Sequence, residues 1–213
     1  MNVAEQTDTR TEADPTSDNL SQAIRGNDEP GIQFWGMAML LRGPVDTVRF
    51  RRIARLILSL GKMSPEWRTA FEIGYDRLEA DKRILVRDEM GELYCHFGQY
   101  GMALKFVAPE PATLPELELA MTVYLQLGRF DDARNIAELC GQGLVTAWNG
   151  QAFGQLLGIL KRYREAIGKQ PNRRQERRTL FDLVLALERE FTDSHGPAAW
   201  EKEQKTDKQE SLG

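Results

Sequence analysis

The chain has 213 residues, of which 41% are hydrophobic and 28% charged, and its formal net charge is -4. This composition is typical of a folded protein with one core of ordinary size, and the pI of about 5.4 indicates neither a nucleic-acid nor a membrane partner. The two cysteines, Cys95 and Cys140, lie far apart and outside any CxxC motif. They argue against a disulfide framework and favour a reducing compartment.

Both ends of the chain are polar. Residues 1–31 form an acidic segment rich in Thr, Ser and Asn, and residues 200–213 are charged. Such segments bury too little apolar surface to offset the entropy of ordering, so we expect disordered tails around one folded domain over 32–199. The first residues lack the basic and apolar regions of a signal peptide. The longest apolar stretch, 34–41, is far shorter than the roughly 20 residues of a membrane-spanning helix, and we expect a cytoplasmic protein.

The first elements follow a helical period. The 34–41 stretch is either the first core helix or an exposed contact for a partner or a membrane surface. Apolar residues recur at spacings of three and four over 50–60, and Gly61 ends that run. Ser64-Pro65-Glu66 then has the pattern of an N-cap, a first-turn proline and an acidic residue at the positive end of a helix. A helix hairpin over 47–80 is the expected result.

Residues 83–97 are ambiguous. Their apolar clusters flank Asp88-Glu89-Met90-Gly91, which allows a β-hairpin, whereas the repeat described below favours a helix. The remaining expected helices are 116–127, 131–139, 148–160 and 173–191. Prolines punctuate the connections at 109–115 and at Pro171, since proline cannot continue a helix interior.

A short motif recurs at intervals of about thirty residues. It combines an apolar residue, a turn residue, a polar residue, an aromatic, two variable residues and an alanine, at 97–103, at 127–133 and more weakly at 160–166. Its packing residues are Gly98, Tyr100, Ala103, Gly128, Phe130, Ala133, Tyr163 and Ala166. Glycine permits the left-handed backbone that ends a helix, the aromatic fills the corner between two helices, and alanine allows their close approach. A repeat of this length is typical of stacked helix pairs.

With these residues the chain resembles the tetratricopeptide repeat family over roughly residues 85–170. The first helices carry the family's apolar, small and aromatic positions at Met90, Gly91 and Tyr94, at Ala120, Met121 and Tyr124, and at Phe153, Gly154 and Leu157. Lys161 replaces the usual glycine of the third copy, and Pro109 and Pro171 shorten two second helices. The resemblance implies an all-α solenoid of stacked helix hairpins, closed by the helix at 173–191.

Members of this family usually bind a peptide or helix of another protein in a concave groove lined by the first helices. The resemblance therefore implies a protein-binding adaptor or a chaperone-like scaffold. The exposed groove candidates are Arg87, Tyr94, Thr122, Gln126, Asn149 and Gln155. Ordinary solvated helix faces are the alternative for the same residues.

Basic residues form two clusters. The first is Arg49, Arg51, Arg52 and Arg55; the second is Lys161, Arg162, Arg164, Lys169 and the run Arg173, Arg174, Arg177 and Arg178. Three interpretations stay open: a solvated face balanced by nearby carboxylates, a site for an acidic protein segment that includes the chain's own N-terminal tail, or a nucleic-acid site. The run at 173–178 lacks interleaved aromatic residues, which is unlike a nucleic-acid groove.

No sequence pattern indicates catalysis. The two histidines, His96 and His195, have neither metal-site nor triad spacing, and there is no glycine-rich phosphate loop, HExxH or GxSxG. We therefore expect no enzyme activity, cofactor or metal, and a protein partner. A nucleic-acid-associated helical protein is the second hypothesis, and an enzyme with an unrecognised site is the third.

Overall fold

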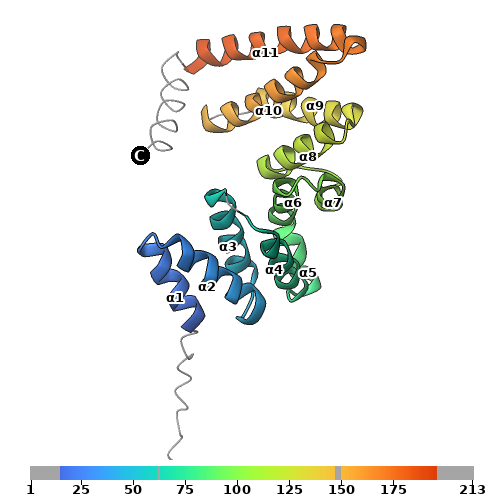
Figure 1. Ribbon diagram of the computed structural model, residues 1–213. Helices are drawn as coiled ribbons and strands as arrows, with labels where there is room; N and C mark the ends of the chain where they lie inside the picture. Colours follow the sequence, from blue (N-terminus) through green and yellow to red (C-terminus); the bar gives the residue numbers. More distant parts are fainter. Residues whose placement is uncertain (1–14, 62, 147–149, 196–213) are drawn as a thin grey trace, which may run out of the picture. The chain divides into compact units, whose positions relative to one another are not determined.

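The computed structural model describes residues 15–61, 63–146 and 150–195. Every regular element in these ranges is a helix, which confirms the expected all-α class (Figure 1). The β-hairpin alternative for 83–97 is wrong. That segment consists of α5 (Ala80–Arg83), the 3-10 turn η1 (Ile84–Val86) and α6 (Arg87–His96). Of the described helices, none is long and apolar enough to cross a membrane.

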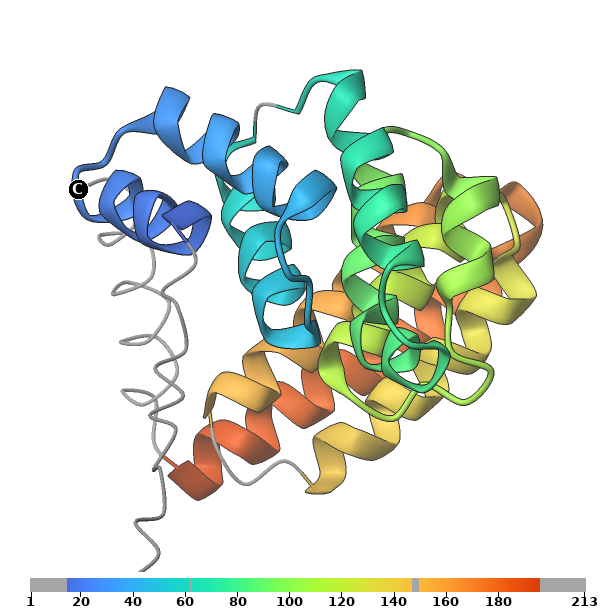
Figure 2. The same cartoon turned by 90° about the horizontal axis from the view of Figure 1, so that it is seen from below.

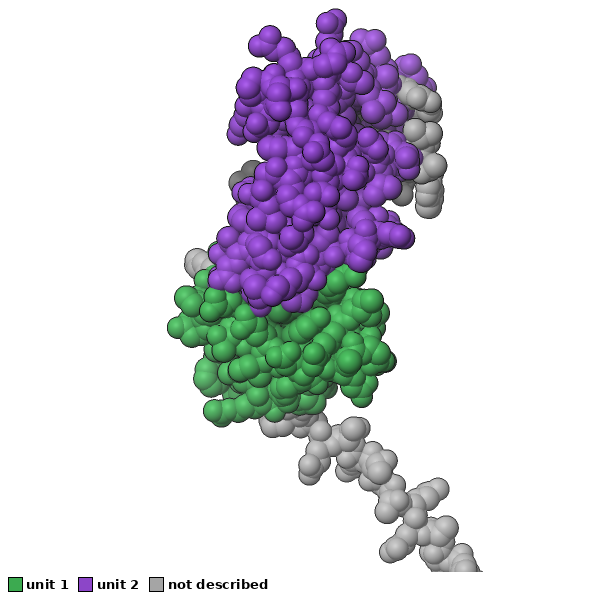
Figure 3. Space-filling view, turned by 90° about the vertical axis from the view of Figure 1, so that its right-hand side faces the viewer, with its two compact units in different colours: residues 1–93 green, residues 94–213 purple. Residues whose placement is uncertain are grey.

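The chain divides into two compact units, residues 1–93 and 94–213, where we expected a single domain over 32–199 (Figure 3). Each unit has its own set of buried apolar side chains. The expected N-terminal tail falls partly on residues 1–14, and the expected C-terminal tail falls wholly on residues 200–213. Both of these ranges lie outside the described residues.

The first unit begins with a helix pair that corrects the expectation for residues 15–31. We expected disorder there, but α1 (Pro15–Arg25) packs along α2 (Glu29–Arg42), and Figures 1 and 2 show the two side by side. Leu20 and Ala23 are buried. Asp28 caps α2 by accepting a hydrogen bond from the Gly31 amide. The average composition of the segment is polar, but its few apolar residues share one helix face, and this face is covered.

The next two helices follow the sequence pattern. α3 (Thr47–Leu60) ends at Gly61, whose φ of 66° is left-handed, and α4 (Pro65–Asp76) starts with proline. Phe50 of α3 meets Phe71 of α4 edge-to-face, with ring centroids 5.5 Å apart. α2 also packs on α4. The core of the first unit lies among these three helices.

The second unit contains α7 (Tyr100–Ala103), η2 (Leu104–Phe106), α8 (Leu114–Gln126), α9 (Phe130–Thr146), α10 (Gly150–Gly168), η3 (Pro171–Arg173) and α11 (Arg174–His195). α10 is central, because it packs on α8, α9 and α11. One apolar cluster joins these four helices, and within it the rings of Phe153 and Phe191 stack at 4.1 Å. The expected last helix is thus α11, which is held to the core through Leu180, Val184, Leu187 and Phe191.

The motif glycines end two helices in the same way. Gly98 and Gly128 have φ values of 68° and 69°, and each lies at the C-terminus of a helix. The amide after each glycine donates to a tyrosine carbonyl five residues earlier, Gln99 to Tyr94 and Arg129 to Tyr124. These are Schellman caps, which only a residue tolerant of positive φ completes without strain.

The third copy of the motif does not form a helix pair. We expected a helix over 148–160 followed by a third copy of the motif at 160–166, with Lys161 at the turn position, but α10 runs without a break from Gly150 to Gly168. Lys161 occupies the position at which the other copies have glycine, and nothing between these ends interrupts the helix. In the third copy the motif aromatic, Tyr163, is a buried core residue within α10. In the first two copies the motif alanines, Ala103 and Ala133, are fully buried.

Candidate functional site

A groove of about 830 Å³ lies between α9 and α11 in the second unit. Both helices pack on α10, which carries Tyr163 into the groove. The apolar surface of the groove comes from Ala137, Gly141, Leu180 and Leu183. The volume falls in the range of protein sites that bind small molecules or the anchoring side chains of a partner. We call this feature the α9–α11 groove.

The groove is open because α9 contributes small residues to it. Ala137 and Gly141 are four residues apart and therefore lie on one face of α9. A Cβ atom on Gly141 would lie 3.9 Å from Cδ2 of Leu183, which is an ordinary contact distance. Leu183 itself remains 44% exposed, since α9 has no larger side chain there to cover it. The result is an apolar wall that faces water.

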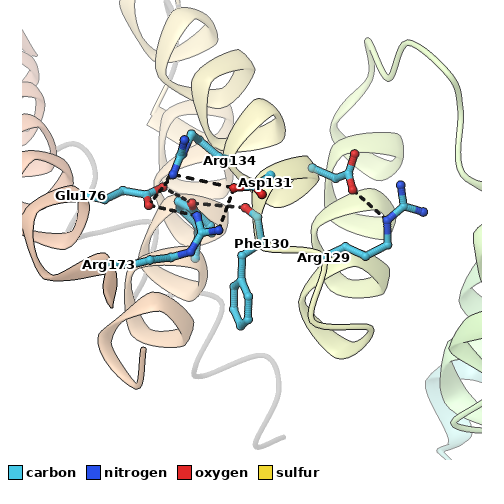
Figure 4. A network of polar contacts seen from close by, with 8 residues as sticks. Arg129, Phe130, Asp131, Arg134, Arg173 and Glu176 are labelled. Atoms are coloured by element: carbon cyan, nitrogen blue, oxygen red, sulfur yellow. Dashed lines mark hydrogen bonds and ion pairs between the residues drawn. The ribbon is translucent and has the colours of Figure 1, made fainter. Parts of the chain in front are cut away.

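A network of charged side chains joins the first turns of the two walls (Figure 4). Arg134 of α9 donates from Nε and Nη2 to the two carboxylate oxygens of Glu176 of α11, at 2.7 and 2.8 Å. Glu176 also accepts hydrogen bonds from the Tyr163 hydroxyl and, at 3.1 Å, from Arg173. Arg173 reaches back to Asp131 of α9 at 2.7 Å. The side chains of the network therefore link α9, α10 and α11.

The protonation states in this network are far from switching at neutral pH. Hydrogen bonding from Arg134 lowers the pKa of Glu176 to about 2, against the opposing effect of burial. Burial, followed by the hydrogen bond to Glu176, raises the pKa of Tyr163 to about 12. A general acid or base works best with a pKa near the operating pH. Glu176 and Tyr163 are therefore suited to holding the walls of the groove and poorly suited to moving protons.

The groove candidates chosen from the sequence lie elsewhere. Tyr94, expected to be exposed, is only 5% exposed, because it stacks on Phe106 with ring centroids 5.5 Å apart. Arg87 is half-buried in the first unit. The Thr122 hydroxyl donates to the Glu118 carbonyl at 2.8 Å. Gln126 and Gln155 are exposed, and Asn149 is outside the described residues. Of the five described candidates, none lines the α9–α11 groove.

The basic clusters separate into paired and unpaired residues. In the first unit Arg51 and Arg55 both contact Glu89, at 2.7 and 3.5 Å, and Arg49 pairs with Asp46. In the second unit Lys161 pairs with Glu188 and Arg162 with Glu118. Arg173 belongs to the network at the groove. The interpretation of a solvated face balanced by carboxylates fits these paired residues. It does not fit Arg174, Arg177 and Arg178, which are exposed and have no ion pair with a described residue.

The apolar stretch 34–41 supplies both core and surface. Met39 and Leu40 are buried in the first unit, as a core helix requires. Phe34 is 64% exposed and, with Leu41 and Trp67, lines a hollow of about 320 Å³. This hollow is smaller than the α9–α11 groove, and no charged network braces its walls in the described residues.

The groove itself could not be chosen from sequence, although one signal was present. Gly141 lies in the interior of a helix, where glycine is unfavourable and often marks a close approach or an open face. Arg134 and Glu176 are 42 residues apart, so their pairing has no local signature. Among the described residues, no group of three or more His, Cys, Asp or Glu side chains is placed to hold a metal ion.

No family model, curated protein or solved structure matches the chain.

Proposed function

We propose that the protein is an interaction module that holds an apolar helical segment of a partner protein in the α9–α11 groove. The observation that carries this proposal is the apolar surface of the two groove walls, which the charged network holds together. Ala137 and Gly141 leave a slot on one side, and Leu183 offers an exposed apolar side chain on the other. Exposed apolar surface of this kind marks sites of association.

The partner segment is expected to be an amphipathic helix. α9 and α11 both begin at the charged network, so the groove runs between two parallel helices. An amphipathic helix places anchors at spacings of three, four and seven along one face and lies well in such a groove. Glu138, Gln142 and Gln175 are exposed at the rim, where they can bond the polar flank of the segment.

Pre-organised walls favour binding. Glu176 holds Arg134 and Arg173 with charge-assisted hydrogen bonds, so little ordering of α9 against α11 is left for the binding step. The network is also neutral within itself, because Asp131 and Glu176 balance Arg134 and Arg173. Apolar anchors, rather than charge, are then expected to set the affinity of the partner.

The relation to tetratricopeptide-like folds is part of the proposal. Two helix pairs, α6 with α7 and α8 with α9, each turn at a left-handed motif glycine, and α10 packs on both α8 and α9. These features support a helical-repeat arrangement. The proposed binding surface differs from the concave one that the resemblance implied.

The test is a selection of random linear peptides on the intact chain, followed by binding isotherms with two variants. Gly141→Leu fills the groove, and because leucine is a better helix former than glycine, α9 is expected to stay folded. Gly101→Leu is the matched control, since a Cβ at that exposed helical glycine meets nothing within 4 Å. We expect apolar, helix-forming peptides whose affinity falls about tenfold or more in Gly141→Leu and is unchanged in Gly101→Leu. Equal affinity for the two variants contradicts the proposal.

A further inference from the structure

A second pocket lies on another face of α11, against the C-terminal part of α10. Its volume is about 420 Å³. It is lined by Arg164 and Glu165 of α10 and by Arg174, Arg177, Arg178 and Phe181 of α11. The α11 residues recur at spacings of three, four and seven and therefore share one side of that helix. Leu183, which faces the α9–α11 groove, lies on the opposite side.

Positive charge in this pocket is not compensated. The four arginines face one carboxylate, that of Glu165. Four other basic residues of the second unit are paired: Arg134 and Arg173 with Glu176, Lys161 with Glu188, and Arg162 with Glu118. By contrast, the side chains of Arg164, Arg174, Arg177 and Arg178 make no ion pair or hydrogen bond with any residue that the structure describes. Their donor groups are available to a ligand.

Two of these arginine side chains are positioned by contacts with their surroundings. The Arg164 guanidinium lies over the Phe181 ring, with its central carbon 5.4 Å from the ring centroid. Arg177 lies against the last turn of α10, where a Cβ on Gly168 would come within 3.2 Å of Arg177 Nε. The absence of a side chain at Gly168 therefore makes room for Arg177. Phe181 remains 45% exposed and gives the pocket one apolar surface.

The chemistry of these groups selects a multiply charged anion. An arginine fork matches the oxygens of phosphate or carboxylate in bidentate fashion. A single carboxylate has two oxygens and one charge, which one fork satisfies. A phosphomonoester carries about two negative charges and three acceptor oxygens, so it can engage several guanidinium groups at once. The volume of about 420 Å³ fits one such group together with a small organic substituent.

We propose that this pocket binds the phosphate of a phosphomonoester whose organic part lies against Phe181. The proposal does not depend on the α9–α11 groove, because the two sites are on different faces of α11. Its phosphate has two possible sources, a free small molecule or a phosphorylated side chain of a partner protein. The sequence run at 173–178 thus divides: Arg173 stabilises the groove network, and Arg174, Arg177 and Arg178 face the ligand.

The test is calorimetric titration of the intact chain with phenyl phosphate at low ionic strength. We expect saturable binding, with weaker binding of inorganic phosphate, which lacks the ring, and of phenylacetate, which has a single charge. The double variant Arg177→Gln/Arg178→Gln is expected to lose about tenfold or more in affinity for phenyl phosphate. Arg52→Gln is the matched control, since Arg52 is an exposed arginine of the first unit; its affinity is expected to equal that of the unchanged protein.

Further readouts separate a ligand site from a structural role and identify the source. Removing unpaired, mutually repelling charges is expected to leave Tm unchanged or raise it in the double variant, whereas a structural role predicts a lower Tm.

Tighter binding of a short peptide containing phosphotyrosine than of phenyl phosphate identifies a phosphorylated side chain as the source of the phosphate, and the reverse order identifies a small molecule. The proposal is overturned by equal affinities of the double variant and Arg52→Gln, or by equal binding of phenylacetate and phenyl phosphate. Preferential binding of single-stranded DNA through the same arginines overturns it in favour of nucleic acid.

Discussion

Replacing Glu176 by glutamine removes the charge at the centre of the groove network while keeping the size of the side chain. Glu176 accepts hydrogen bonds from three side chains, those of Arg134, Arg173 and Tyr163. Glutamine offers a single carbonyl acceptor and adds two donors, which face the arginine donors. We therefore expect the Glu176→Gln variant to loosen the contact between α9 and α11.

The magnitude follows from the pKa of Glu176. A fall in this pKa from 4.5 to about 2 corresponds to roughly 3 kcal/mol of stabilisation if the group is shielded from water. The Glu176 side chain is 20% exposed and that of Arg134 is 43% exposed, so solvent screens part of the interaction. We expect a loss of about 2 kcal/mol in the free energy of unfolding. For a chain of this size that corresponds to a decrease in Tm of about 4–8 °C.

Urea unfolding of the unchanged protein and the variant as a function of pH gives the sharpest readout. The pKa of Glu176 is lower in the folded protein than in the unfolded chain, so folding favours its ionised form. The stabilisation is complete above the unfolded pKa of 4.5 and is lost as the pH falls toward about 2. The stability difference between the two proteins is expected to be constant near neutral pH and to shrink across that acidic window.

Glu138→Gln is the matched control, because Glu138 is exposed at the rim of the same groove. We expect its stability to stay within about 0.5 kcal/mol of the unchanged protein. Equal stabilities of Glu176→Gln and Glu138→Gln would refute the role given to the network. A Glu176→Gln difference that persists undiminished to pH 2 would refute its electrostatic origin.

Three further predictions concern the second unit. Burial raises the pKa of the Cys140 thiol to about 12. Alkylation under native conditions should therefore modify the half-buried Cys95 first, and Cys140 only when the second unit opens. Equal labelling rates of the two cysteines, measured by mass spectrometry, would contradict this expectation. Tyr163→Phe should lower the free energy of unfolding in urea by about 1 kcal/mol, because the phenylalanine ring still packs but has no hydroxyl to donate to Glu176. The absorbance titration of the variant should also lack the tyrosine whose pKa is raised to about 12. Gly128→Ala should cost about 1 kcal/mol, since alanine is strained at a φ of 69°, and Gly101→Ala should cost nothing; similar unfolding midpoints for these two variants would show that the Schellman cap is unimportant.

Local signals predicted much of the helical pattern. Gly61, Gly98 and Gly128 each end a helix in the left-handed conformation, and Pro65 begins one. These residues act through backbone conformation, which depends on the residue itself and its nearest neighbours. For this reason their effect could be predicted from the sequence without knowledge of tertiary contacts.

Two expectations about elements were wrong for identifiable reasons. The disorder expected up to residue 31 relied on average composition, whereas α1 is stabilised by a few apolar residues, including Leu20, on one face. The helix end expected at residue 160 relied on a copy of the motif that lacked its glycine. Without a residue that favours left-handed backbone, α10 continues through Lys161.

The candidate sites depend on long-range pairing, which composition and spacing do not reveal. The Arg173–Arg178 run was recognised as basic, but only the fold shows that Arg173 is neutralised by Asp131 and Glu176 while Arg177 is not. Arg164 and Phe181 come from different helices and meet only in the folded unit. The aromatic residue that the run lacked in sequence is therefore supplied by the next turn of α11.

The central claim is that an apolar segment occupies the α9–α11 groove, and methyl NMR of the intact chain tests it most directly. A selected peptide is added to saturation, and the leucine methyl resonances are followed. We predict large shifts for Leu180 and Leu183, which line the groove, and none for Leu58, which lies on α3 of the first unit. Tight peptide binding that leaves the Leu183 methyls unshifted would contradict the claim and place the binding surface elsewhere.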